Sequence, residues 1–177
     1  GNRGAISANY TISVDSSAPT QTVVISNIVD DVAPQTGNVA NGGTTNDVTP
    51  TLQGTISTVL NAGEVVAVYR DGVKVGTATV TNSTWTFADT GLADATSYTY
   101  TARVEDAAGN QGVVSNNYAI NVDTSAPTQS VIIASVTDDF APQTGVVANN
   151  GSTNDTTPLL AGTISVALNP GETVVIL

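Results

Sequence analysis

The chain has 177 residues, no Cys, His or Met, and 4 Lys and Arg against 15 Asp and Glu, which gives a formal net charge of −11. This charge disfavours binding to nucleic acid or to an anionic membrane surface, and the missing side chains exclude disulfides, zinc–thiolate sites and the usual general base. With 40% hydrophobic residues spread along the chain, we expect a folded protein, and no apolar stretch is long enough to cross a bilayer.

The predicted elements are all strands, because apolar and polar residues alternate in segments rich in Val, Thr and Tyr. In chain order the strands are residues 21–28, 51–57, 65–70, 73–81, 84–88, 97–105 and 112–122. Asp71-Gly72 and Asn82-Ser83 are hairpin signals, and residues 106–110 turn the chain before the last strand. The side chains predicted to face inward are Trp85, Phe87, Tyr98, Tyr100, Ala102 and Val104. About seven short strands in roughly 100 residues predict an all-β, immunoglobulin-like β-sandwich.

The sequence also repeats itself. Residues 9–21 recur almost unchanged as residues 117–129, so Asp15 and Asp123 share one position and the offset is 108 residues. About 42 of the 69 overlapping positions are identical, which is typical of tandem, domain-sized repeats. We therefore divide the chain into the last strand of a preceding Ig-like repeat (1–14), a complete repeat (15–122) and the N-terminal half of the next repeat (123–177). Half a sandwich cannot bury its strands alone, and residues 1–14 of another copy could replace only one of the missing strands.

Ten of the 15 carboxylates fall at strand ends, in loops or in the linker between repeats. Carboxylates gathered without Lys or Arg favour a bound cation, and calcium fits because it takes six to eight oxygen ligands and needs neither His nor Cys. At one junction we expect calcium ligands from Asp106, Asn110, Asp123, Asp138, Asp139 and Asp155. The equivalent upstream group is Asp15, Asp30, Asp31 and Asp47. The alternative is that these are solvated turn residues, and the adjacent Asp30 and Asp31 can divide into one ligand and one turn-stabilising residue.

Several segments carry a family resemblance: Val-Asp-Thr-Ser-Ala-Pro-Thr (122–128), Thr-Asn-Asp-x-Thr-Pro (45–50), Val-Tyr-Arg-Asp-Gly (68–72) and Val-Glu-Asp-Ala-Ala-Gly-Asn (104–110). Over essentially its whole length the chain resembles the bacterial Ig-like repeats of giant surface adhesins and biofilm-associated proteins. The resemblance implies an extracellular stalk on a bacterial cell surface, exported by a type I system and rigidified by calcium at its junctions. It also implies that the metal is carried by the linker Asp (Asp15 or Asp123), the loop acids (Asp30, Asp31 and Asp47) and Asp106 of the turn.

The leading hypothesis is a spacer, because near-identical repeats contribute length and a neighbour interface. Its partners would be neighbouring repeats of the same chain, with other copies of the adhesin or a host or abiotic surface contacted through other regions. The alternative is a module that binds glycan or protein or self-associates, which needs an exposed aromatic or apolar patch. Catalysis is not expected, since Ser and Thr have no His to activate them. A Lys–Asn isopeptide would need a buried Lys, and we expect Lys74 to be exposed.

Overall fold

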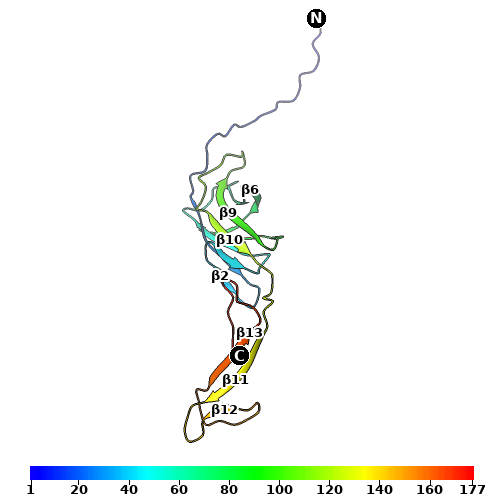
Figure 1. Ribbon diagram of the computed structural model, residues 1–177. Coiled ribbons are helices and arrows are strands. Elements are labelled where there is room, and N and C mark those ends of the chain that lie inside the picture. The colour runs from blue at the N-terminus through cyan, green and yellow to red at the C-terminus, as the bar shows by residue number, and fades with distance from the viewer. The chain divides into compact units, whose positions relative to one another are not determined.

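A computed structural model describes residues 1–177 as strands and loops without helices, so no helix is long and apolar enough to span a membrane. The chain forms two compact units, Gly1–Ser125 and Ala126–Leu177, which we describe separately (Figure 1). In the first unit, residues 1–22 form no regular secondary structure, and the side chains of residues 1–18 are exposed. The strands therefore begin with the complete repeat.

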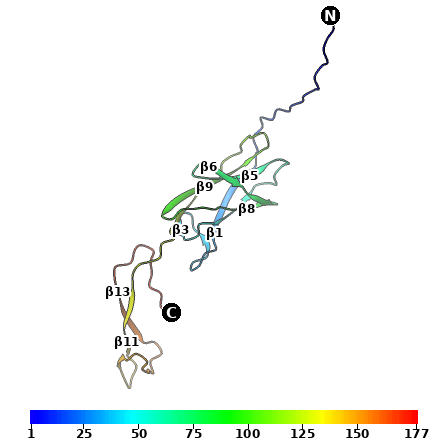
Figure 2. The same cartoon turned by 90° about the vertical axis from the view of Figure 1, so that its right-hand side faces the viewer.

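Two five-stranded sheets form the complete repeat (Figure 2). The strands of the first sheet, in spatial order, are β2 (Gly37–Val39), β1 (Val23–Asp30), β4 (Thr51–Ile56), β8 (Thr84–Ala88) and β7 (Thr79–Thr81). Those of the second sheet are β3 (Gly43–Thr45), β10 (Tyr118–Val122), β9 (Thr96–Glu105), β5 (Val65–Arg70) and β6 (Val73–Thr77). All neighbouring strands are antiparallel except β3 and β10, which run parallel. The predicted all-β, Ig-like sandwich is confirmed.

The core lies between the two sheets and follows the alternation of the sequence. Tyr100, Ala102 and Val104 of β9 are fully buried, as predicted, and Trp85 of β8 is 1% exposed. Trp85 pairs with Gly54 of β4, where a Cβ atom would lie 2.5 Å from the indole ring. Glycine at this position therefore makes room for the largest side chain of the core.

The observed strands differ from the predicted ones in four respects. The first strand runs to Asp30 because a bulge between Ile25 and Asn27 shifts the alternation, so that Ile28 and Asp30 also point inward. The predicted strand 73–81 divides at Ala78, since β6 belongs to the second sheet and β7 to the first. The last strand begins only at Tyr118. The three-residue strands β2 and β3 were not predicted, because runs rich in Gly, Asn and Thr show no periodicity.

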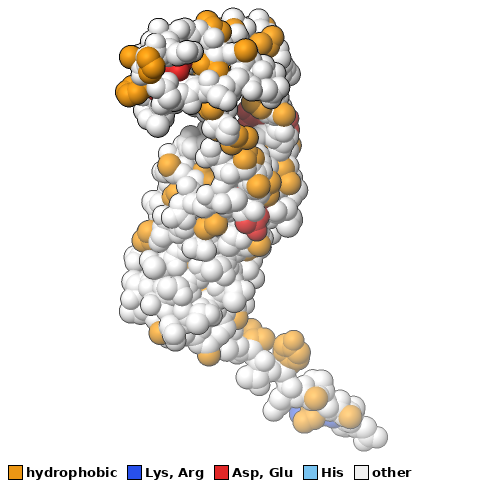
Figure 3. Space-filling model, turned by 90° about the horizontal axis from the view of Figure 1, so that it is seen from below, with side chains coloured by type: hydrophobic (Ala, Val, Ile, Leu, Met, Phe, Trp, Pro, Cys, Tyr) orange, Lys and Arg blue, Asp and Glu red, His pale blue; other side chains and the backbone are white.

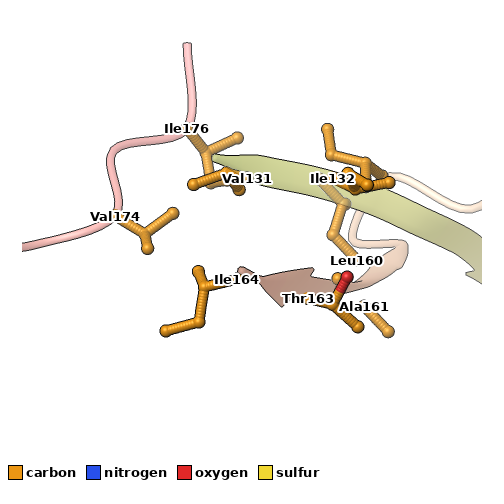
Figure 4. A pocket seen from close by; sticks show the side chains of 10 residues that line it. Val131, Ile132, Leu160, Ala161, Thr163, Ile164, Val174 and Ile176 are labelled. Atoms are coloured by element: carbon orange, nitrogen blue, oxygen red, sulfur yellow. The ribbon is translucent and has the colours of Figure 1, made fainter. Parts of the chain in front are cut away.

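The second unit has one sheet with strand order β12 (Gly145–Val147), β11 (Val131–Asp138) and β13 (Leu159–Ile164). Its registers reproduce those of β2, β1 and β4, including the bulge between Ile133 and Ser135. The face that the complete repeat buries is open here: Ile133 is 56% exposed, whereas its counterpart Ile25 is 2% exposed. Figure 4 shows Val131, Ile164, Val174 and Ile176 beside a hollow of about 270 Å³ on this face. The half-repeat thus leaves its strands exposed, as expected.

Candidate calcium sites at the two ends of the repeat

The C-terminal end of the repeat, where β10 leaves the sandwich, contains two buried carboxylates. Asp30 and Asp47 are 5% and 1% exposed, and both contact the hydroxyl group of Thr45. Thr45 Oγ1 donates to Asp30 Oδ2 over 2.5 Å and accepts from the Asp47 amide over 3.0 Å. The other oxygens accept backbone N–H groups, from Val32 at Asp30 Oδ1 and from Thr49 at Asp47 Oδ1. These Asx-type bonds hold both carboxylates in fixed orientations.

Asp30 and Asp31 divide in the way the sequence left open. The Asp30 side chain is buried and stabilises the loop, whereas Asp31 is exposed and its carboxylate makes no hydrogen bond. Asp31 contacts the buried acids only through its backbone, whose N–H group lies 3.4 Å from Asp47 Oδ2. Asp31 is therefore the member of the pair whose carboxylate is free for an external ligand.

The linker residue Asp123 is tied to the same end. Its N–H group donates to the Thr45 carbonyl over 2.9 Å, and its Oδ1 atom accepts the Ser125 amide over 3.0 Å. Asp94, in the loop between β8 and β9, accepts the Thr124 amide over 2.7 Å and the Ser125 hydroxyl over 3.1 Å. These hydrogen bonds, led by the Thr124 amide, lower the pKa of Asp94. Sequence reasoning missed Asp94, because only the folded sandwich brings its loop beside the linker.

The N-terminal end, where the chain approaches β1, holds the turn between β9 and β10. Asp106 Oδ2 accepts the Asn110 side-chain amide over 2.8 Å, and Asp106 Oδ1 accepts the Ala108 and Asn110 N–H groups. These bonds, with the Asn110 side chain contributing most, lower the pKa of Asp106. Asn110 Nδ2 also lies 3.1 Å from the Asp15 carbonyl, while Asp15 Oδ1 accepts the Ser17 amide. Asp15, Asp106 and Asn110 therefore meet within one repeat.

The predicted grouping of the candidate ligands was wrong. Val122 pairs with Thr96 at the start of β9, whereas Asp106 follows Glu105 at its end. At about 3.3 Å per residue, this strand separates Asp106 and Asn110 from Asp123 by roughly 30 Å. Asp15 is likewise at the opposite end of the repeat from Asp30, Asp31 and Asp47. The reason is topological: the turn before an antiparallel strand and the end of that strand lie at opposite ends of the sheet.

The second unit reproduces the loop of the C-terminal end. Thr153 Oγ1 donates to Asp138 Oδ2 over 2.6 Å and accepts the Asp155 amide over 3.0 Å. Asp155 Oδ1 accepts the Thr157 amide, which lowers the pKa of Asp155, and the Asp139 amide lies 3.3 Å from Asp155 Oδ2. Asp138 ends β11, at the end of the strand away from residues 126–130 where the chain enters this unit. The predicted grouping of Asp138, Asp139 and Asp155 with Asp123 is thus also wrong, and these acids belong to the far end of their own repeat.

No Lys or Arg neutralises the acids at either end. The three ion pairs of the chain join Arg70 to Asp89, and Lys74 and Arg103 to Glu105. Glu105, the last residue of β9, therefore has two basic partners. On the face drawn in Figure 3, acidic side chains occur in a few separate spots and hydrophobic ones are scattered.

The donor types at both ends, which are carboxylates, backbone carbonyls and an Asn side chain, are those that calcium prefers. No three acidic side chains of the chain converge closely enough to hold a metal ion by themselves. A calcium site at either end would therefore also need carbonyl oxygens, water or ligands from an adjoining repeat.

The strand order, the parallel pair at one edge and the core between two sheets define a β-sandwich of immunoglobulin type. A family model described as "Bacterial Ig-like domain" matches residues 21–124, more than half of the chain, and the chain belongs to this family. Exoglucanase B of Cellulomonas fimi is 36% identical over 111 residues, which are 60% of this chain and 10% of the exoglucanase. The chain thus spans about a tenth of the length of this relative, and the sequence resemblance to bacterial Ig-like repeats is confirmed.

Proposed function

We propose that this chain is a section of the stalk of a large bacterial cell-surface adhesin, in which Ig-like repeats act as spacers stiffened by calcium at their junctions. In this role the protein is exported by a type I system and supports cell adhesion and biofilm formation by carrying an adhesive region away from the cell. The role is mechanical and involves no catalytic step. A repeat whose longest strand, β9, has 10 residues adds on the order of 30–40 Å to such a stalk.

The observation that carries the proposal is the recurrence of the buried acidic loop. Asp30, Thr45 and Asp47 in one repeat and Asp138, Thr153 and Asp155 in the next form the same hydrogen bonds within 0.1 Å. Burying two carboxylates without a basic partner costs stability, and the recurrence of this arrangement in each copy favours a functional role. A loop that recurs at the same end of each repeat suits a linear array, because each end must fit the next repeat.

The corrected geometry supports a definite composition for each junction. A junction joins the C-terminal end of one repeat to the N-terminal end of the next, and the linker Asp belongs to both. The complete repeat supplies Asp30, Asp31, Asp47, Asp94 and Asp123 to one junction, and Asp15, Asp106 and Asn110 to the other. Bound calcium would neutralise these carboxylates and hold the two ends in one orientation. The existing hydrogen bonds orient each carboxylate while leaving lone pairs free, since an ionised carboxyl group has about four.

Calcium titration of the chain tests the proposal. Trp85 is the only Trp and lies in the core of the complete repeat, so its fluorescence follows the unfolding of that repeat alone. At 100 times its Kd, calcium would stabilise the repeat by about 2.7 kcal/mol, which raises Tm by roughly 10 °C or more relative to chelator. Asp47→Asn and Asp123→Asn keep the side-chain shape and should abolish this increase.

Asp71→Asn is the matched control, because Asp71 is an exposed acid in the hairpin turn between β5 and β6 and accepts only the Thr99 amide. Small-angle scattering of the same chain should show larger overall dimensions with calcium than with chelator. A Tm and scattering profile that are the same in millimolar calcium and in excess chelator would contradict the spacer mechanism.

A further inference from the structure

Three of the four basic residues lie on the second sheet, although the chain as a whole carries a charge of −11. Arg70, Lys74 and Arg103 come from β5, β6 and β9. Arg70 contacts Asp89, which is buried. Lys74 and Arg103 lie with Tyr69 and Glu105 on the opposite, outer face, since they alternate along the strands with core residues such as Val68 and Val104.

The carboxylate of Glu105 forms an ion pair with Lys74 and accepts a hydrogen bond from Tyr69. Lys74 Nζ lies 2.5 Å from Glu105 Oε2, and the Tyr69 hydroxyl donates to Glu105 Oε1. Burial alone would raise the pKa of Glu105, but the hydrogen bonds from Lys74 and Tyr69 and the nearby charges outweigh it, so the pKa is lowered. Glu105 therefore has two neighbouring cations, of which Lys74 makes the closer contact.

Arg103 is the more distant of these two cations and makes no hydrogen bond to the protein. Its Nε atom is buried without a partner, 3.5 Å from Glu105 Oε1, and its guanidinium lies 4.3 Å from the centre of the Tyr69 ring. The Arg103 side chain is only 21% exposed. Buried polar groups are nearly always paired, and the N–H groups of a guanidinium form a planar fork. Arg103 lies over the Tyr69 ring and makes no hydrogen bond of its own, so its fork can bind an acceptor outside the protein.

A hollow of about 210 Å³ lies against this donor, lined by Tyr69, Gly72, Thr101, Arg103 and Val114. Gly72 leaves one wall open, since a Cβ atom there would meet nothing within 4 Å. The hydroxyl group of Thr101 makes no hydrogen bond within the protein and Val114 is 49% exposed, so the hollow offers one charged, one polar and one apolar contact. Its volume is below the range of about 300–1,000 Å³ usual for drug-sized ligands and suits a single small ring.

We propose that Arg103 and this hollow bind the carboxylate of a small hydroxylated acid of the size of one uronic acid sugar. Arg103 pairs with the two carboxylate oxygens, because the guanidinium fork matches their spacing, and Thr101 contacts a hydroxyl group of the ligand. The site is independent of the spacer function and of calcium. The aromatic ring of the site is not repeated, since the position of Tyr69 is Leu177 in the next copy.

Titration with glucuronate, followed by ¹H–¹⁵N NMR of the 177-residue chain, tests the proposal. We expect saturable shifts at the Gly72 and Thr101 amides and at the Arg103 Nε–H group, with a Kd of about 1–10 mM. Glucose should cause no such shifts, and acetate should bind more weakly than glucuronate. Equal shifts with glucose would overturn the proposal. So would the absence of shifts at about 50 mM glucuronate, which is roughly five times the weakest expected Kd. Equal affinity for acetate would overturn the part played by the hydroxyl groups.

Variants locate the site. Arg103→Lys keeps the positive charge but loses the fork, and should weaken glucuronate binding about tenfold; Arg103→Gln should abolish it. Tyr69→Leu, which introduces the residue of the next copy, should also weaken binding about tenfold, because the guanidinium loses its support. Trp85 fluorescence reports whether each variant is folded. Undiminished binding by folded Arg103→Lys and Arg103→Gln would show that the arginine is not the receptor of the carboxylate and would refute the assignment.

Discussion

Thr45→Val is the most direct test of the acidic loop, because it removes one hydroxyl group and hardly changes the side-chain volume. Two buried groups lose their partner: Asp30 Oδ2, which accepts the hydroxyl, and the Asp47 amide, which donates to it. Leaving a buried polar group unpaired costs about 1–3 kcal/mol, and more when the group is charged. The free energy of unfolding of the repeat should therefore fall by about 2–5 kcal/mol, which lowers Tm by roughly 10 °C or more for a domain of this size.

Thermal and urea unfolding followed by Trp85 fluorescence measures this loss in the complete repeat alone. Thr44→Val is the matched control, since Thr44 is the exposed neighbour in the same strand, β3. It should change the free energy of unfolding by less than about 0.5 kcal/mol. A loss for Thr45→Val no larger than this would refute the reasoning, because the buried carboxylate would then have found water or another donor at little cost.

Two further predictions concern packing and pH. Gly54→Ala should destabilise the repeat by about 2–4 kcal/mol in the same unfolding assay, because the new methyl group meets the Trp85 ring and the Val24 carbonyl. Thr55→Ala, on the exposed face of β4, is the control, and equal losses of stability in the two variants would contradict the packing argument. Hydrogen bonds lower the pKa of Asp94 and Asp106 in the folded protein, so their stabilising contribution is present above the ordinary Asp pKa of about 3.9 and is lost as the pH falls through the lower folded values. The ¹H–¹⁵N shift of the Thr124 amide should titrate below pH 3.9, and this titration should vanish in Asp94→Asn; a midpoint above 3.9 would reverse the sign of the argument.

The sequence predicted the sandwich well where one physical rule controls the structure. Alternation gave β5 and β8 their observed bounds and identified the inward-facing Tyr100, Ala102 and Val104, because the pleat alone decides which side chains are buried. The prediction failed where the pairing partner of a strand determines to which sheet the strand belongs. Nothing in residues 73–81 marks Ala78 as the point where the chain changes sheets, since both parts alternate in the same way and their partners are distant in sequence.

The candidate site was predictable as a set of residues but was wrongly divided between the two ends. The repeat offset identified Asp15, Asp30, Asp47 and Asp123 as one constant set, yet assigning each to an end requires the strand directions. The sequence did imply one of these directions. The turn that joins two antiparallel strands lies at the start of the second strand, so Asp106 in the turn and Asp123 after β10 are at opposite ends. The role of Asp94 could not be predicted, because its contact with Thr124 joins residues that only the folded sandwich brings together.

The acids of the loop at the C-terminal end are the same in the two copies, whereas a group of touching residues on a face of the repeat changes. On the outer face of the first sheet, Asn27 donates to Asn38 Oδ1 over 2.8 Å and lies 3.3 Å from Gln53 Oε1. All three residues of this contact change together in the next copy, to Ser135, Val146 and Ala161, whereas the acids and the Thr of the loop at the C-terminal end are identical. A face contacts only its own repeat, so a set of touching residues can be exchanged without disturbing the array, while an end must fit its neighbour. A property carried by a face, such as the binding proposed at Arg103 and Tyr69, can therefore differ from repeat to repeat, and glucuronate binding should follow the presence of Tyr at that position while calcium binding does not.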